Sequence, residues 1–291
     1  MDNALSEWLR QRESADTAAR STALTQAIVD ALPLGEPLRI LDLATGQGSN
    51  VRFLAERLPG PQRWLAVDRS ALLLTVLRDE LCTWGAERGY AVRTGAELCS
   101  IQGTDIVCDV ETQQMDLGTL SRDDIFAGRH LVTASALLDL VSESWLLTLA
   151  ARCREVSAAA LFTITYNGHF SCFPEETEDA VVRALMNQHQ KTDKGLGGPA
   201  AGPGAAVRAE QCFKDAGYSV RREPSDWMLS SADADVQRAL VDGWAEAAME
   251  MAPEQALLFG DWRARRLAHV DAGRSRLTVG HDDLAAWLPH G

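Results

Sequence analysis

Short, nearly continuous apolar runs alternate with helical patterns between residues 38 and 166, and this alternation limits the folds open to the chain. The runs predict strands at Leu38–Leu43, Trp64–Val67, Ile106–Thr112, His130–Ser135 and Ala160–Tyr166. The intervening patterns predict helices at Ser49–Leu58, Ser70–Trp84 and Ser142–Val156. Strands that are buried on both faces read as continuous apolar runs, and parallel neighbours need helical crossovers. The sequence therefore predicts an α/β fold with a doubly wound, mostly parallel sheet.

The segments on either side of this pattern are mainly helical. We expect residues 1–34 to form an N-terminal helical segment against the sheet, and residues 35–291 to form the main domain. Helical insertions are expected at about 167–204 and 230–272, and the first contains a Gly-rich loop. The remaining predicted elements are helices at Glu175–Gln190, Ala205–Ala216 and within Ala232–Val270, and strands at Tyr218–Arg221 and Arg276–Val279.

The charge balance argues against polyanionic partners. The chain of 291 residues has 28 lysines and arginines against 41 acidic residues, a formal net charge of −13. Such a charge repels nucleic acid and anionic membranes, so we expect neither as a partner. The first ten residues lack a leader pattern, and no apolar run approaches the ~20 residues of a membrane span. A soluble, cytoplasmic protein is expected, whereas its oligomeric state is left open.

The segment 38–50 contains the most informative motif, an apolar strand that ends in an acid and runs into a Gly-rich turn. Ligands bind at the carboxyl ends of strands in open α/β sheets, and Gly46 and Gly48 would let a ligand approach the backbone closely. A dinucleotide fingerprint would require a third glycine, where this chain has Val51. Asp42 would repel a pyrophosphate but would suit a ligand with an ammonium group.

This segment resembles motif I of the class I S-adenosylmethionine-dependent methyltransferases, D-x-G-x-G-x-G. Asp42, Ala44, Gly46 and Gly48 occupy the motif positions, with Thr45 inside the turn, so an alanine replaces the first glycine. The resemblance implies S-adenosylmethionine as cofactor, S-adenosylhomocysteine as product and no metal. It also implies a Rossmann-like sheet of seven strands, of which the last is antiparallel.

A second acid fits the same resemblance. Asp68 ends the next predicted strand, 20 residues after Gly48, at the spacing expected for a carboxylate that accepts hydrogen bonds from ribose hydroxyls. Its neighbour Arg69 is expected beside the cofactor. Asp68 could instead cap the helix that begins near Ser70.

The third strand of the family ends in an acid that meets the adenine amino group. The best match here is Asp116, with the amide of Leu117 beside the ring. Asp105 and Asp109 are alternatives, and each of these acids could also be a solvated residue at a strand edge.

Two further cofactor contacts are expected from the resemblance. Ala134 and Ser135 fall at the end of the fourth strand, beneath the cofactor. Arg20 could bind the cofactor's carboxylate, as basic residues before motif I do in some members. Arg12, Asp16 and Arg20 are spaced by four residues, however, so helical ion pairing of Asp16 with both arginines explains them as well.

The substrate is expected to meet residues that follow the fifth strand. Tyr166 and His169 lie where the chain is predicted to leave the sheet, although this stretch could be an ordinary surface turn. Lys194 is one of only three lysines in the chain, and His189 is our candidate for a general base. A helix C-terminus explains both residues equally well. The Gly-rich loop after them could close over the substrate.

Together, these features predict methyl transfer from S-adenosylmethionine to an oxygen or nitrogen of a small molecule. The enzyme would act mainly by aligning the acceptor and excluding water. An NAD(P)-dependent oxidoreductase on a Rossmann sheet is the first alternative, and the missing third glycine counts against it. A methyltransferase-like binding protein without activity is the second alternative, which the alanine in motif I leaves open.

Overall fold

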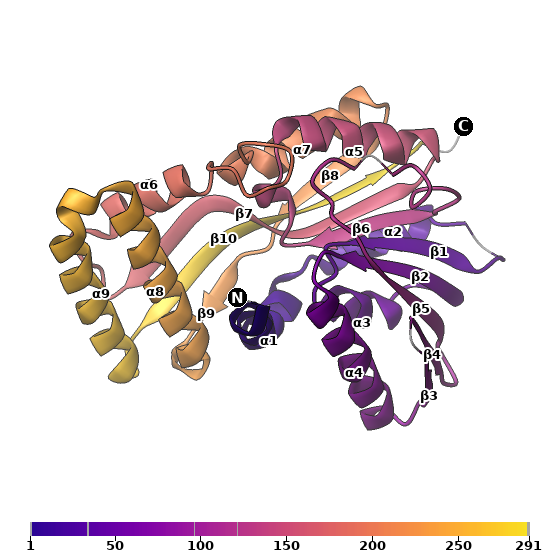
Figure 1. The fold of residues 1–291 in the computed structure, drawn as a ribbon, viewed down its shortest axis with the longest axis horizontal. Helices are drawn as coiled ribbons and strands as arrows, with labels where there is room; N and C mark the ends of the chain where they lie inside the picture. Colours follow the sequence, from indigo (N-terminus) through magenta and orange to yellow (C-terminus); the bar gives the residue numbers. More distant parts are fainter. Residues whose placement is uncertain (1, 34, 96, 121, 290–291) are drawn as a thin grey trace.

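A single mixed sheet forms the centre of the molecule (Figure 1). The computed structural model describes residues 2–33, 35–95, 97–120 and 122–289, and within these ranges the sheet has ten strands. The strands are β1 (Leu38–Leu43), β2 (Pro61–Asp68), β3 (Ala91–Thr94), β4 (Leu98–Gln102), β5 (Val107–Gln114), β6 (Leu131–Ser135), β7 (Ala159–Phe173), β8 (Ser219–Pro224), β9 (Trp227–Leu229) and β10 (Arg276–Trp287). Residues 1 and 34 of the predicted N-terminal segment lie outside the described ranges.

The strand order confirms the predicted fold class. The order is β3-β4-β5-β2-β1-β6-β7-β10-β8, with β9 paired to β10. Strands β5, β2, β1, β6 and β7 are parallel, whereas β10 runs antiparallel to β7 and β8. Seven strands therefore form the expected sheet with an antiparallel last strand, and β3, β4 and β9 are additions that the sequence did not predict.

Helices cover both faces of this sheet. They are α1 (Asp2–Ala19), α2 (Thr22–Ala31), α3 (Ser49–Ala55), α4 (Ala71–Glu87), α5 (Glu143–Glu155), α6 (Asp179–His189), α7 (Ala205–Asp215), α8 (Ala234–Met251) and α9 (Ala256–Asp271). Successive strand residues point to opposite faces, so Ile40 packs in the core with α2, α3 and α4, whereas Leu41 packs with α5 and α7. Each core is a cluster of buried hydrophobic side chains, which fixes the register of the central strands.

Serine caps set the start of several helices close to the predicted residues. The Ser70 hydroxyl accepts a hydrogen bond from the Leu73 amide at 3.3 Å, and the Ser142 hydroxyl accepts one from Trp145 at 3.2 Å. Each cap satisfies an amide that has no partner within its helix. Consequently α4 begins soon after β2 and α5 soon after β6, both at the carboxyl edge of the sheet.

Strand β7 is longer than predicted, and this corrects the expected turn at Tyr166–Phe170. The strand continues to Phe173, and the register with β10 shifts where residues 167–169 oppose Gly280 alone. The Asn167 side chain occupies the space that a Cβ on residue 280 would need. An Asn-Gly pair that would suit a turn thus forms a bulge within two long paired strands.

A third core lies at the far end of these two strands. Helices α6, α8 and α9 pack there on β7 and β10, and α1 lies between α8 and the α3–α4 side of the molecule (Figure 1). In the described ranges no helix is long and apolar enough to span a membrane. The carboxyl ends of β1, β2 and β6 and this helical end enclose the space in which most of the predicted site residues lie.

Candidate active site

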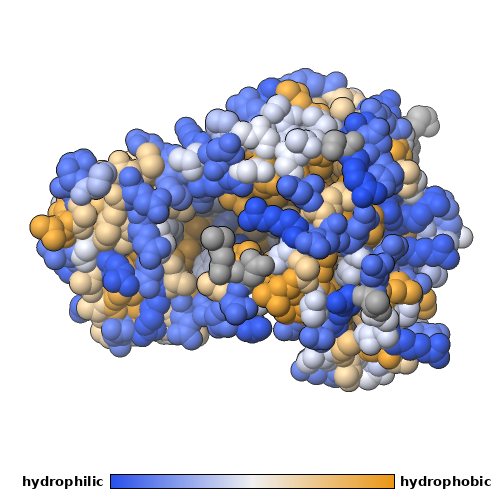
Figure 2. Space-filling view, in the orientation of Figure 1, coloured by the Kyte–Doolittle hydropathy of each residue, from blue (hydrophilic) through white to orange (hydrophobic). Residues whose placement is uncertain are grey.

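A cavity of about 780 Å³ lies at the carboxyl ends of β1, β2 and β6 and extends to α1, α6 and α8. Hydrophobic residues gather near the middle of the face drawn in Figure 2, among mainly hydrophilic surroundings. The volume of the cavity is typical of pockets for small ligands. Among the predicted site residues, those that line it are Asp42, Ala44, Thr45, Gly46, Asp68, Arg69, Leu117, Ser135, Tyr166, His189 and Lys194.

The turn after β1 has a left-handed backbone at three positions. Ala44, Gly46 and Gly48 have φ values of 51°, 56° and 75°. A Cβ at Gly48 would lie 2.8 Å from Cγ of Leu77 on α4, so this glycine allows α3 to start close to α4. Gly46 faces α1, where a Cβ would lie 3.2 Å from Leu9. Ala44 adopts a backbone conformation that favours glycine, the residue that motif I has at this position. The methyl group of Ala44 therefore strains the backbone.

Asp42 lies buried under this turn with two short hydrogen bonds. Its carboxylate accepts from Thr45 Oγ1 at 2.5 Å and from Asn50 Nδ2 at 2.6 Å. Burial raises the pKa of Asp42 to about 6, against the opposing effect of these two donors. Arg20 donates to Asn50 Oδ1 at 2.8 Å, which directs the amide nitrogen of Asn50 toward Asp42.

Arg20 is fully enclosed behind the cavity wall. It also donates to Ser135 Oγ at 3.1 Å, and its Nε atom has no partner within the described residues. Helix α1 ends at Ala19, so Arg20 leaves the face shared by Arg12 and Asp16. Within the part of the chain that the structure describes, Asp16 forms its ion pair with Arg12 alone, at 3.0 Å, which corrects the expected pairing with both arginines.

Asp68 joins the second strand to the glycine turn. Its Oδ2 accepts from the Gly46 amide and its Oδ1 from the Ser70 amide, both at 2.9 Å. The first bond ties the ends of β2 and β1 together, and the second orders the start of α4. A carboxylate oxygen can accept more than one hydrogen bond, so this geometry leaves acceptor capacity on the cavity side.

Several predicted site residues do not line the cavity. Asp116 is exposed, and its carboxylate accepts from the Gly118 amide at 2.9 Å. Ala134 is buried within β6, and His169 is exposed on β7 beyond the cavity. With Arg20 and Gly48, these residues stay predictions as ligand contacts.

Two predicted substrate residues lie together at the end of α6. The His189 ring is 3.1 Å from a carboxylate oxygen of Glu250, on α8. Lys194 donates to the His189 carbonyl oxygen at 3.1 Å and to Thr192 Oγ1 at 2.9 Å. Partial burial lowers the pKa of Lys194. Both side chains therefore reach the cavity with partners already in place.

Aromatic side chains that the sequence reasoning missed form much of the wall opposite the glycine turn. They are Trp8 on α1, Trp227 on β9 and Trp244 on α8, which join Tyr166 on β7. Trp244 stacks on Phe170 with ring centroids 3.9 Å apart. The chain has eight tryptophans but only three tyrosines, and this excess of tryptophan was the sequence feature that could have predicted an aromatic wall.

Two buried polar residues of the lining were also missed. Asp139 lies in the short helical turn Leu138–Leu140 after β6, is 6% exposed, and has its pKa raised to about 6 by burial. His281 on β10 is 5% exposed, and burial lowers its pKa to about 3. Asp139 could have been found in the sequence as the one acidic residue within the otherwise apolar run 137–141. No sequence pattern marks His281.

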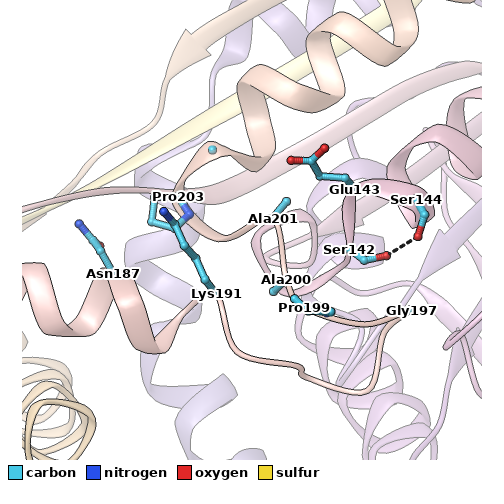
Figure 3. Close-up of a pocket in the computed structure, with 11 residues that line it drawn as sticks. Ser142, Glu143, Ser144, Asn187, Lys191, Gly197, Pro199, Ala200, Ala201 and Pro203 are labelled. Carbon is cyan, nitrogen blue, oxygen red and sulfur yellow. Dashed lines mark hydrogen bonds between the residues drawn. The ribbon is translucent and has the colours of Figure 1, made fainter. Parts of the chain in front are cut away.

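A second hollow, of about 900 Å³, lies outside this cavity and is drawn in Figure 3. Asn187 and Lys191 of the α6 end lie across it from Glu143 and Ser144. The Gly-rich loop beside it is joined to residues 141 and 142 by two backbone hydrogen bonds, of 2.7 and 3.0 Å. None of the predicted catalytic, cofactor or substrate residues lines this hollow.

No protein-family model and no curated protein matches the chain. Among solved structures, the YcgJ protein from Bacillus subtilis is 12% identical, with a TM-score of 0.47, over 93% of this chain and 100% of that one. The cyclopropane synthase MmaA2 from Mycobacterium tuberculosis is 10% identical, with a TM-score of 0.43, over 90% and 83%. Geranyl diphosphate methyltransferase in complex with SAM is 9% identical, with a TM-score of 0.41, over 92% and 85%.

Proposed function

We propose that the chain is a methyltransferase that uses S-adenosylmethionine to methylate an oxygen or nitrogen of a small molecule. The observation that carries the proposal is the hydrogen bond from the Gly46 amide to Asp68, beside the cavity. It brings together the two motifs on which the resemblance to class I methyltransferases rests. The sheet has the strand arrangement that this resemblance implies.

The residues present fit such a cofactor. In this proposal the free acceptor capacity of Asp68 receives the ribose hydroxyls, and Leu117 lies beside the adenine. The methionine end lies over the turn that Asp42 orders, and the residues of this turn line the cavity. When bound, S-adenosylmethionine supplies the methyl group.

The protein's own contribution would be alignment and the exclusion of water. Helix α1 covers the turn through Leu9, and Gln47 donates to the Ser6 carbonyl oxygen at 2.8 Å, which ties α1 to the turn. Holding an acceptor at the methyl group in a closed cavity lowers the entropic cost of reaction. We propose His189 and Lys194 as polar contacts of the acceptor.

Calorimetric titration with S-adenosylhomocysteine and with NADH tests the cofactor. We expect S-adenosylhomocysteine to bind and Asp68→Asn to weaken it by about 1.5–3 kcal/mol, the value of a hydrogen bond to a charged group. Asp79→Asn, on the exposed face of α4, is the matched control and should bind as the wild type does. Tight NADH binding without S-adenosylhomocysteine binding would favour the oxidoreductase instead.

Turnover separates an enzyme from a binding protein. Mass spectrometry of reactions with S-adenosylmethionine and pooled small-molecule acceptors should detect a methylated product. Cofactor binding without any product would favour the binding protein that lacks activity. The cytoplasmic location and the absence of nucleic-acid and membrane partners stay predictions.

A further inference from the structure

The cavity has more room and more polar groups than the proposed cofactor contacts use. Its second half lies between α1, α8 and the middle parts of β7 and β10, and the charges there are mostly neutralised. Arg12 pairs with Asp16, which also accepts from Trp227 Nε1 at 3.1 Å. Lys194 is held by the His189 carbonyl oxygen and by Thr192. Neither cation is therefore free to attract an anionic substrate strongly.

Asp139 is the exception among these groups. Its carboxylate makes no hydrogen bond or ion pair with another side chain in the described ranges, and its protein partners are the Tyr166 amide and its own amide, which donate to it. Arg12 and Lys194 act on it only at longer range. A buried carboxylate without a partner costs free energy, and such groups are usually paired in folded proteins. The cavity-facing side of Asp139 thus lacks the partner that a cationic ligand would supply.

A second buried polar side chain reaches the same space. His281 lines the cavity, and its Nδ1 atom has no hydrogen-bond partner in the described ranges. Its low pKa keeps the imidazole neutral, so it adds no positive charge that would compete with a cation. His281 is 4.8 Å from Trp227 and 6.2 Å from Tyr166, measured between ring centroids. A carboxylate without a side-chain partner and a neutral imidazole therefore line the same cavity, among aromatic side chains.

Aromatic walls complete the match to a cation with an apolar body. Trp8, Trp227, Trp244 and Tyr166 provide both apolar contact area and electron-rich ring faces. Arg12 already lies over the Trp227 ring, with its guanidinium carbon 5.0 Å from the centroid. Ring faces of this kind attract ammonium groups as well as guanidinium groups.

We propose that this half of the cavity binds an amine with an apolar body, and that Asp139 holds the ammonium group and takes its proton. The proposal rests on the methyltransferase function proposed above and names its acceptor class. Burial makes the Asp139 carboxylate a stronger base than an exposed aspartate, in keeping with proton transfer.

The bound ammonium gives one proton to Asp139, which leaves a lone pair on nitrogen. That pair forms the bond to the methyl carbon of S-adenosylmethionine, and sulfur keeps the electrons of the broken bond. The products are a methylated ammonium ion and neutral S-adenosylhomocysteine, and Asp139 then loses its proton to solvent.

Binding of matched probes tests the acceptor class. With S-adenosylhomocysteine at saturation, we expect tryptamine or phenethylamine to bind, and indole-3-propionate and 3-phenylpropionate to bind at least tenfold more weakly. Asp139→Asn should weaken the amines at least tenfold without changing S-adenosylhomocysteine affinity. Glu246→Gln removes an exposed carboxylate from the cavity mouth and should change amine affinity less than twofold.

Each result decides the question. Equal binding of amines and carboxylates, failure of both amines to bind, or equal effects of the two variants would overturn the proposal. Absence of S-adenosylhomocysteine binding to the wild type would instead refute the methyltransferase function. For proton transfer, amine methylation by Asp139→Asn should rise between pH 7.5 and 9.5 more steeply than that of the wild type, because unprotonated amine then comes from solution. Parallel pH profiles would leave Asp139 no role in taking the proton.

Discussion

Asp139→Asn should stabilise the folded protein at neutral pH, because the wild-type carboxylate is buried without a side-chain partner. Asparagine has nearly the same shape and carries no charge, so the substitution removes the cost of ionisation inside the fold. Burial raises the pKa of Asp139 from 3.8 to about 6, and Arg12 and Lys194 offset only part of that shift. At 1.36 kcal/mol per pKa unit, the shift of roughly two units corresponds to about 3 kcal/mol at pH 7.5.

The sign follows from linkage. The folded-state pKa is higher than the unfolded one, so the contribution of Asp139 to stability is fully present below about pH 3.8 and is lost as the pH rises through about 6. The advantage of the variant should therefore be about 3 kcal/mol at pH 7.5 and less than about 1 kcal/mol near pH 4. Constant differences between the asparagine and aspartic acid side chains cancel in this comparison.

Urea unfolding followed by tryptophan fluorescence at the two pH values measures the difference. Glu246→Gln serves as the control, since its carboxylate is exposed and should give no such pH dependence. A stability difference between the variant and the wild type that is the same at both pH values would refute the reasoning. The Asp139 carboxylate would then be satisfied by the protein itself, and the argument for a cationic ligand would lose its basis.

Three further predictions concern the fold around the cavity, and urea unfolding checks each of them. Ala44→Gly should stabilise the protein by about 1 kcal/mol, because the left-handed backbone there suits glycine, and a destabilised variant would contradict this. Gly48→Ala should destabilise it, because the added methyl group meets a leucine of α4 at 2.8 Å; unchanged stability would show that α4 can shift freely. Asp179→Ala should cost about 3–5 kcal/mol, because it leaves the guanidinium of the fully buried Arg266 without its carboxylate, whereas Asp242→Ala, at an exposed ion pair, should cost less than about 1 kcal/mol.

The central sheet could be predicted because its strands carry one signal throughout. Leu38–Leu43 was predicted with the bounds that β1 has, since a strand buried on both faces is apolar at nearly every position. The hairpin of β3 and β4 was missed for the opposite reason. Its strands have four and five residues at the exposed edge of the sheet, where packing demands little of the sequence.

The two halves of the cavity differ in the same way. The glycine turn and Asp68 are close in sequence to their strands, so local sequence motifs were enough to predict them. Asp139 and His281 are 142 residues apart and line the same cavity because β10 returns antiparallel beside β7. The bulge that sets the register at His281 depends on contacts between Asn167 and Gly280, which no local pattern reveals.

The division of the cavity between distant stretches of chain has an evolutionary consequence. The turn over Asp42 is encoded within residues 38–50, whereas the Trp244 wall belongs to α8, in the segment between β9 and β10. Substitutions in α8 can reshape the pocket for a new compound while the first strand and its turn stay unaltered. The compounds that the pocket accepts can therefore change without any change in the glycine turn.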